Sequence, residues 1–426
     1  MSKYNKIEKS WIMYDWASST FSMIIITTIL PLYFRMVYEN SGGNSSLATA
    51  FWGYSNSIST LIIAIFAPVL GTIADYKGYK KKFFKSFLFI GLIFTLMLAL
   101  VPSSSWKLLL ICFIICSIGY SGCGIFYDSF LVDVTEEKKM NMVSAIGFSV
   151  GYAGNTISFG ICMTIVLLSQ ANIIPLSIAS AFKLCFLVTV LWWGLNSLPM
   201  IKNVKQVYGI IPEPRPITNS FKRLGGTLKN IKHHKNLFMF LLAYFFYIDG
   251  VNTIITMATS FGSDLKISSS SMLIILLMTQ IVAFPCAIIF GKLSEKYNGK
   301  TMLFVGILIY SIICIYAHFV HNSIGFWILA MMVATSQGGI QAISRSYYGK
   351  LVPKEKSNEF FGFYNIFGRF AAILGPFLVG IVTQITGKSS NGLFSIIILF
   401  IVGGIILAKV PDNKEEYSVD NSVLEA

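Results

Sequence analysis

Apolar stretches long enough to cross a membrane recur along the whole 426-residue chain, and they constrain its fold more than any other feature. A transmembrane helix needs about 20 mostly apolar residues. Because 55% of the residues are hydrophobic and only 12% are charged, a soluble fold could not cover its surface with polar groups. The pattern predicts an all-α integral membrane protein with twelve transmembrane helices, at 11–36, 47–73, 83–102, 106–131, 142–169, 174–199, 236–262, 268–293, 301–320, 323–348, 359–386 and 390–409.

One segment in the middle of the chain breaks this rhythm. It contains three prolines and eight lysine or arginine residues between positions 200 and 235. Such a segment is typical of a linker between two helical bundles. The sequence therefore predicts an N-terminal six-helix bundle (1–200), a basic cytoplasmic linker (201–235), a C-terminal six-helix bundle (236–410) and a cytoplasmic tail (411–426).

The net charge of +14 is distributed unevenly over the predicted loops. The loops on the side of the two termini hold most of the lysines, whereas the opposite loops hold only Arg35, Lys107, Lys266 and Lys388. The positive-inside rule then predicts that both termini are cytoplasmic and that the protein lies in the cytoplasmic (plasma) membrane. This distribution explains the basic charge without a nucleic-acid partner.

A short loop motif occurs twice, 220 residues apart, after the second and the eighth predicted helix. Each copy has a glycine, three residues, an acid, a second glycine and at least one lysine. The first glycine lets helices approach, the acid can lie at the N-terminus of a neighbouring helix, and the second glycine permits a tight turn. The motif residues are Gly71, Asp75, Gly78, Lys80 and Lys81 in the first copy, and Gly291, Glu295, Gly299 and Lys300 in the second.

The doubled loop resembles that of the major facilitator superfamily, whose two halves are parallel six-helix repeats. The segment Tyr14-Asp15-Trp16-Ala17 in the first helix is similar to the opening of the unknown major facilitator family, a relative of the fungal vacuolar amino-acid effluxers of autophagy. The resemblance covers essentially the whole chain. It implies that helices 1, 4, 7 and 10 line a central cavity between two six-helix bundles.

Polar residues at three- and four-residue spacing form one stripe on each of these four helices. An ionisable group inside the bilayer costs at least about 2.5 kcal/mol, so each needs an explanation. We expect Asp249 and Asp15 to couple transport to protons; hydration of Asp15 at the membrane interface is the alternative. The residues that we expect to bind substrate are Ser18, Ser22, Tyr127, Asn252, Thr256, Gln337, Gln341 and Arg345. For the hydroxyl groups, bonds that hold helices together are an equal alternative.

Two arginines on helices 10 and 11 allow two interpretations. Arg345 and Arg369 could bind a substrate carboxylate or phosphate, because a guanidinium is always charged. They could instead form gate ion pairs across the two halves, with Asp128 and Asp133 as partners.

These features together predict a secondary active transporter for a small polar solute, such as an amino acid, that works by alternating access and is driven by protons or another ion. A drug or metabolite efflux antiporter and a sugar or nucleoside carrier are alternatives, as is a membrane receptor or channel. No nucleotide-binding loop and no clustered His, Cys or Glu constellation is visible in the sequence, so we expect no cofactor, no metal and no enzymatic activity. We expect a monomer.

Overall fold

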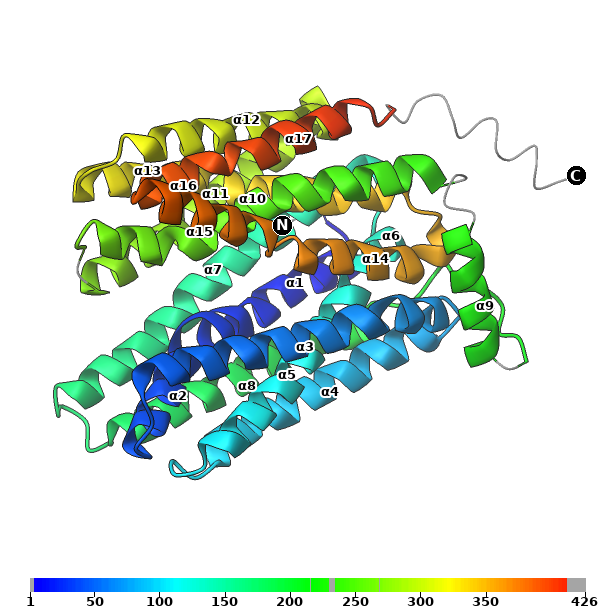
Figure 1. Ribbon diagram of the computed structural model, residues 1–426. Helices are drawn as coiled ribbons and strands as arrows, with labels where there is room; N and C mark the ends of the chain where they lie inside the picture. Colours follow the sequence, from blue (N-terminus) through cyan, green and yellow to red (C-terminus); the bar gives the residue numbers. More distant parts are fainter. Residues whose placement is uncertain (1–3, 215, 230–233, 268, 412–426) are drawn as a thin grey trace, which may run out of the picture.

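The computed structural model describes residues 4–214, 216–229, 234–267 and 269–411. This part of the chain contains 12 segments that are long and apolar enough to cross a membrane, at the places that the apolar stretches predict. They pack as two bundles, one built by the first half of the chain and one by the second (Figure 1). The predicted all-α membrane fold is thus confirmed.

The first bundle contains the first six spans. The opening span is a continuous run of three elements, α1, a π-helical turn and α2. The elements are α1 (Lys6–Phe21), η1 (Ser22–Thr28), α2 (Ile29–Asn40), α3 (Ser45–Ala74), α4 (Tyr79–Leu100), α5 (Trp106–Ser129), the short α6 (Leu131–Val134), α7 (Glu137–Gln170) and α8 (Ile178–Asn203).

The second bundle contains the other six spans, of which the last two are interrupted. Its elements are α10 (Lys235–Asp264), α11 (Ser269–Tyr297), α12 (Gly299–His318), α13 (Ser323–Leu351), the single turn η3 (Lys354–Lys356), α14 (Ser357–Phe370), α15 (Leu374–Thr386), α16 (Ser389–Ser395) and α17 (Ile397–Ala408).

The eleventh span differs from the single helix predicted at 359–386. It breaks at residues 371–373, between α14 and α15. Pro376 favours the break, because proline donates no backbone hydrogen bond and its ring clashes with the carbonyl group four residues earlier. Gly375 allows close packing there, since a Cβ at this position would overlap the Thr253 hydroxyl. Two half-helices therefore replace one continuous span.

The segment between the bundles also contains an element that the sequence analysis did not predict. Helix α9 (Pro216–Lys229) follows a proline-rich turn and lies beside the end of α3 (Figure 1). Proline suits the first position of a helix, where its missing N–H has no helical partner. Arg223 of this helix stacks its guanidinium on the Tyr76 ring, 4.6 Å from the centroid.

Candidate functional site

The two bundles approach each other closely at the end of the molecule where α1 begins and α17 ends. The first glycine of each loop motif lies in this contact. A Cβ at Gly71 would overlap the carbonyl O of Asn358 in the other half. A Cβ at Gly291 would lie 2.6 Å from Cβ of Ala145 and 2.9 Å from Sδ of Met142. Both glycines therefore permit the close helix approach that their motif predicts.

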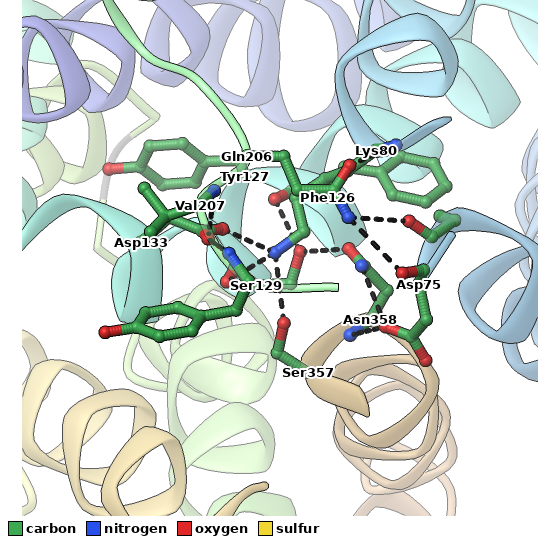
Figure 2. Close-up of polar contacts among 12 residues, drawn as sticks. Asp75, Lys80, Phe126, Tyr127, Ser129, Asp133, Gln206, Val207, Ser357 and Asn358 are labelled. Atoms are coloured by element: carbon green, nitrogen blue, oxygen red, sulfur yellow. Dashed lines mark hydrogen bonds and ion pairs between the residues drawn. The ribbon is translucent and has the colours of Figure 1, made fainter. Parts of the chain in front are cut away.

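Asp75, the acid of the first loop, caps the N-terminus of α14 across the two halves (Figure 2). Its Oδ1 accepts hydrogen bonds from the backbone N–H and the side-chain amide of Asn358, both at 2.9 Å, and its Oδ2 accepts the N–H of Glu359 at 3.2 Å. Burial raises the pKa of Asp75 from 3.8 to about 7; the Asn358 donors and the Lys80 charge oppose the rise, and the Glu359 charge adds to it.

Lys80 of the same loop is fully buried and is held by both halves. Its Nζ forms an ion pair with Asp133 at 2.6 Å and donates to the Ser129 carbonyl at 3.2 Å and to the Ser357 hydroxyl at 3.0 Å (Figure 2). The Ser129 hydroxyl in turn donates to Oδ1 of Asn358 at 2.6 Å. Asp133 therefore pairs with Lys80 of its own half, and not with an arginine across the halves.

A segment of the linker, residues 204–210, packs along the first loop; we call it the linker strap. It forms a parallel bridge between Tyr76 and Ile210. Two of its consecutive N–H groups donate to Oδ1 of Asp133 at 2.8 and 2.9 Å. Lys81 donates from Nζ to a carbonyl O at the start of the strap, at 2.7 Å. The strap thus immobilises the loop that carries Asp75.

Gln206 is the polar anchor of the linker strap, and its removal gives a first testable effect. Its Oε1 accepts the N–H groups of Gly78, at 2.9 Å, and of Lys80, at 3.3 Å. We expect Gln206→Ala to lower the free energy of unfolding by about 0.5–1.5 kcal/mol, the usual net contribution of a hydrogen bond, because the Gly78 bond is exposed and the Lys80 bond only partly buried. Melting of the purified protein in detergent checks this. Gln206→Glu keeps an acceptor oxygen but loses the Nε2 donor that bonds to the carbonyl groups of Ala74 and Asp75, at 3.2 and 3.5 Å, so we expect it to destabilise the protein as well. An unchanged Gln206→Ala melting temperature would contradict the anchoring role.

The second copy of the loop is built differently. Glu295 is exposed, and no described residue forms an ion pair with it. The left-handed turn residue is Asn298, with φ of 71°, and not the following Gly299, whereas in the first copy it is Gly78, with φ of 86°. Lys300 donates from Nζ to the carbonyl O of Val410 at 2.6 Å and so ties down the end of α17. The capping function predicted for both acids holds for Asp75 alone.

Arg345 of α13 is the centre of a second contact between the halves. It is 3% exposed and forms ion pairs with Asp15, from Nη2 at 3.1 Å, and with Asp128, from Nη1 at 3.2 Å. Its Nε and Nη2 also donate to the hydroxyl and the carbonyl O of Ser144, at 3.0 and 3.2 Å. The guanidinium therefore has a partner on each of its three nitrogens.

Three aromatic rings enclose the same guanidinium. Its carbon lies 4.4 Å from the ring centroid of Phe148, 4.7 Å from that of Trp11 and 5.3 Å from that of Tyr127. Tyr127 and Trp11 also stack on each other, with centroids 4.5 Å apart. Cation–π contacts of this kind strengthen when water is excluded. The arrangement makes Arg345 a clamp between the bundles.

A cavity of about 230 Å³ lies directly beside this clamp. Helices α5, α7, α10, α13 and α14 line it, so both halves contribute. Its polar side chains, among the described residues, are Asp128, Asn252, Gln341, Arg345, Asn365 and Arg369, together with the tyrosines Tyr244 and Tyr364. The structure thus brings together three of the eight predicted substrate-binding residues, Asn252, Gln341 and Arg345.

The other five predicted substrate-binding residues lie outside the lining of this cavity. The ring of Tyr127 turns toward Trp11, and the Thr256 hydroxyl bonds to the Asn252 carbonyl on its own helix at 2.9 Å. Gln337 borders a separate, mainly apolar cavity inside the second bundle. Ser18 is 9% exposed, and Ser22 begins the π-helical turn, where its carbonyl O accepts the Thr27 hydroxyl at 3.0 Å.

Asp249 contacts the break in the eleventh span, a position that the polar stripe on its own helix did not indicate. It is fully buried against the break in the eleventh span. Its carboxylate accepts the N–H groups of Leu374 and Gly375, each at 3.0 Å, and the Thr253 hydroxyl at 3.2 Å. Because the first N–H groups of a helix have no helical partner, a carboxylate there stabilises α15. Asp249 is thus the N-terminal cap of a half-helix, close to the cavity but outside its lining.

Two bundles of six spans around a clamped polar cavity define a membrane transporter of the major facilitator type. The family model described as "Vacuole effluxer Atg22 like" matches residues 43–418. The chain belongs to this family, as its first-helix segment suggested.

Among curated proteins, the chain is 57% identical over 422 residues to "Uncharacterized MFS-type transporter YxiO" of Bacillus subtilis (strain 168), covering 99% of this chain and 98% of that protein. It is 22% identical to "Autophagy-related protein 22" of Vanderwaltozyma polyspora, over 92% of this chain and 88% of that protein.

Solved structures share the fold at low identity. The proton:xylose symporter XylE bound to 6-bromo-6-deoxy-D-glucose is 12% identical, with a TM-score of 0.73 and 96% of each chain covered. The major facilitator transporter FucP in the outward conformation is 14% identical, with a TM-score of 0.69 over 95% of this chain and 100% of that one. The predicted fold and superfamily are confirmed by these comparisons.

Proposed function

We propose that this protein is a secondary active transporter that carries a small polar solute, an amino acid or a similar metabolite, by alternating access and with proton coupling. The observation that supports this most is the polar cavity beside Arg345. It is small, it is lined by both halves, and ion pairs between the halves close one end. In alternating access, the closed end opens while the other end closes, and a solute held in the cavity is released on the opposite side of the membrane.

The charge distribution supports an orientation for this cycle. The end that the ion pairs close carries the loops rich in lysine, so we place it, and both termini, on the cytoplasmic side of the plasma membrane. The division into bundles at 1–200 and 236–410, the linker at 201–235 and the tail at 411–426 belong to the same proposal. In this orientation the ion pairs of Arg345 lie on the cytoplasmic side of the cavity.

Purified protein in liposomes tests the transport proposal. We expect saturable uptake and counterflow with at least one small polar solute. Counterflow with apolar cations alone would indicate a drug efflux antiporter. Counterflow with sugars or nucleosides alone would indicate a carrier for those solutes. Linear flux without counterflow would indicate a channel, and the absence of any flux would favour a receptor without transport or enzymatic activity.

Asp249 gives a test of proton coupling that also depends on its capping role. We expect Asp249→Asn to keep counterflow but to lose concentrative uptake under a pH gradient, because the amide oxygen still accepts one of the two N–H groups of α15 and the side chain no longer titrates. Asp249→Ala should in addition destabilise the protein by about 1 kcal/mol, the usual cost of a lost cap. Uptake and melting measured on both variants separate the two roles.

Thr253→Val is the matched control for Asp249. It removes the hydroxyl that donates to Asp249 and leaves the carboxylate and its two backbone partners in place. Concentrative uptake by Asp249→Asn at the wild-type level would remove this residue from proton coupling. Asp15, which forms an ion pair with Arg345, would then be the remaining candidate.

A further inference from the structure

The cavity contains one arginine whose charge is unused. Arg369 lies at the end of α14 and lines the cavity. Within the described part of the chain it forms no ion pair and no hydrogen bond, and its Nε is buried without a partner. A guanidinium keeps its charge at every physiological pH, so it cannot avoid this cost by losing a proton. An unpaired charge in such a place indicates a ligand.

Arg345 cannot supply the same function in this state. Its three nitrogens already bond to Asp15, Asp128 and Ser144. A substrate that bound Arg345 would have to displace one of these partners and separate the halves. The sequence listed Arg345 for substrate binding and left a gate ion pair open for both arginines; among the described residues it is Arg345 that forms the ion pairs between the halves, and Arg369 forms none.

We propose that Arg369 binds a carboxylate group of the transported solute. The planar guanidinium fork matches the two oxygens of a carboxylate and can bond to both. This assignment rests on the proposed transport function and names the chemical group that its cavity selects.

The surroundings of Arg369 limit the kind of carboxylate. The amide side chains of Asn252, Gln341 and Asn365 lie around the same cavity, where Asp128 is already paired with Arg345. The lining therefore has one uncompensated positive charge, that of Arg369, which matches a solute with a single carboxylate better than a dicarboxylate or a phosphate. The volume of about 230 Å³ is below the range typical of drug-sized ligands, which favours a solute of few heavy atoms.

The test compares acids with their amides on the purified full-length protein. Probes are L-amino acids and short monocarboxylates, each paired with its carboxamide, together with glucose, uridine and inorganic phosphate. We expect at least one acid to bind and exchange, and its amide to bind at least about tenfold more weakly, because a neutral amide loses the charged bidentate pair. Thermal shift gives the binding, and counterflow gives the exchange.

Substitutions then assign the effect to Arg369. We expect Arg369→Gln to weaken binding of the acid at least about tenfold and to leave the weak binding of its amide nearly unchanged, since the amide does not use the charge. Arg369→Lys should retain part of the preference. Arg35→Gln is the control, because Arg35 is exposed and pairs with Glu39 at 2.9 Å on its own helix.

The proposal is overturned if the amides bind as tightly as the acids, if phosphate binds in place of every monocarboxylate, or if no acid binds. The comparison of acid with amide uses the wild-type protein, so it remains decisive even if Arg369→Gln fails to fold. Counterflow of glucose or uridine without acid binding would leave the carrier intact and remove the carboxylate site. Acid binding that depends on Arg369 without any counterflow would keep the carboxylate site and exclude the transport function.

Discussion

Replacing Arg345 by Gln should abolish counterflow and strongly lower the thermal stability of the protein. The change leaves Asp15 and Asp128 side by side, largely buried and without their shared cation. Removing one partner of a buried ion pair costs about 3–5 kcal/mol, because the remaining charge stays uncompensated. The aromatic clamp of Trp11 and Phe148 also loses its cation.

A combined variant distinguishes the loss of stability caused by the unpaired carboxylates from the loss of transport. Arg345→Gln together with Asp15→Asn and Asp128→Asn removes the whole ion-pair group, so we expect it to recover much of the melting temperature without recovering counterflow. Arg345→Lys keeps a charge but loses the fork that reaches both carboxylates, and we expect an intermediate result. Wild-type melting and counterflow by Arg345→Gln would show that the clamp does not hold the halves together.

The closed end should open as the pH rises, and Asp75 should cause this. The pKa of Asp75 is about 7 in the closed state, because of burial and the nearby charge of Glu359, which Lys80 and the Asn358 donors only partly offset. When the halves separate, the carboxyl meets water and its pKa returns toward 3.8. The closed state therefore binds the proton more tightly, and it loses stability relative to the open state as the pH rises from about 4 to about 7.

Spin labels on the two halves can measure this shift. Lys77 and Glu355 are exposed on either side of the closed end, and the seven native cysteines are buried or partly buried. With cysteines introduced at Lys77 and Glu355, we expect the long-distance population to grow as the pH rises from about 5 to about 7 and to level off above the Asp75 pKa of about 7.

Variants of the two loop acids provide the contrast. We expect Asp75→Asn to make the distance distribution nearly independent of pH, because the amide does not titrate. Glu295→Gln is the matched control: it alters the equivalent acid of the second loop, which is exposed, and should leave the pH dependence unchanged. A pH dependence that survives in Asp75→Asn would exclude Asp75 as its cause.

Most of the fold followed from the sequence, because the length and polarity of each stretch reflect the membrane itself. Helix ends differ from the predicted ones by a few residues, as at α7, which begins at Glu137 and not at 142. The break in the eleventh span was not predicted, although a Gly-Pro pair, Gly375 and Pro376, stands there in the sequence. Whether such a pair bends or breaks a helix depends on a partner for the freed N–H groups, and Asp249 lies more than a hundred residues away.

The candidate site was predicted in outline, and its pairings only in part. The sequence offered an ion pair of Arg345 with Asp128 as one of two interpretations, whereas the pairing of Arg345 with Asp15 was not predicted and follows from the packing of α1 and α13. Asn358 was missed, although an amide at the expected start of a helix is a recognisable capping signal. Gln206 had no signal, because its contacts depend on how an irregular linker folds back on the first loop.

The gap between α14 and α15 has a consequence for leakage. The side chain of Asn252 donates to the Ala371 carbonyl at 3.0 Å, so the gap is braced from α10 although the helix itself is interrupted. In the transport cycle proposed above, we expect α15 to move about this joint while α14 keeps its contacts with Asp75 at the closed end. The cavity is then never open to both sides of the membrane at once, so ions do not leak through the protein during a cycle.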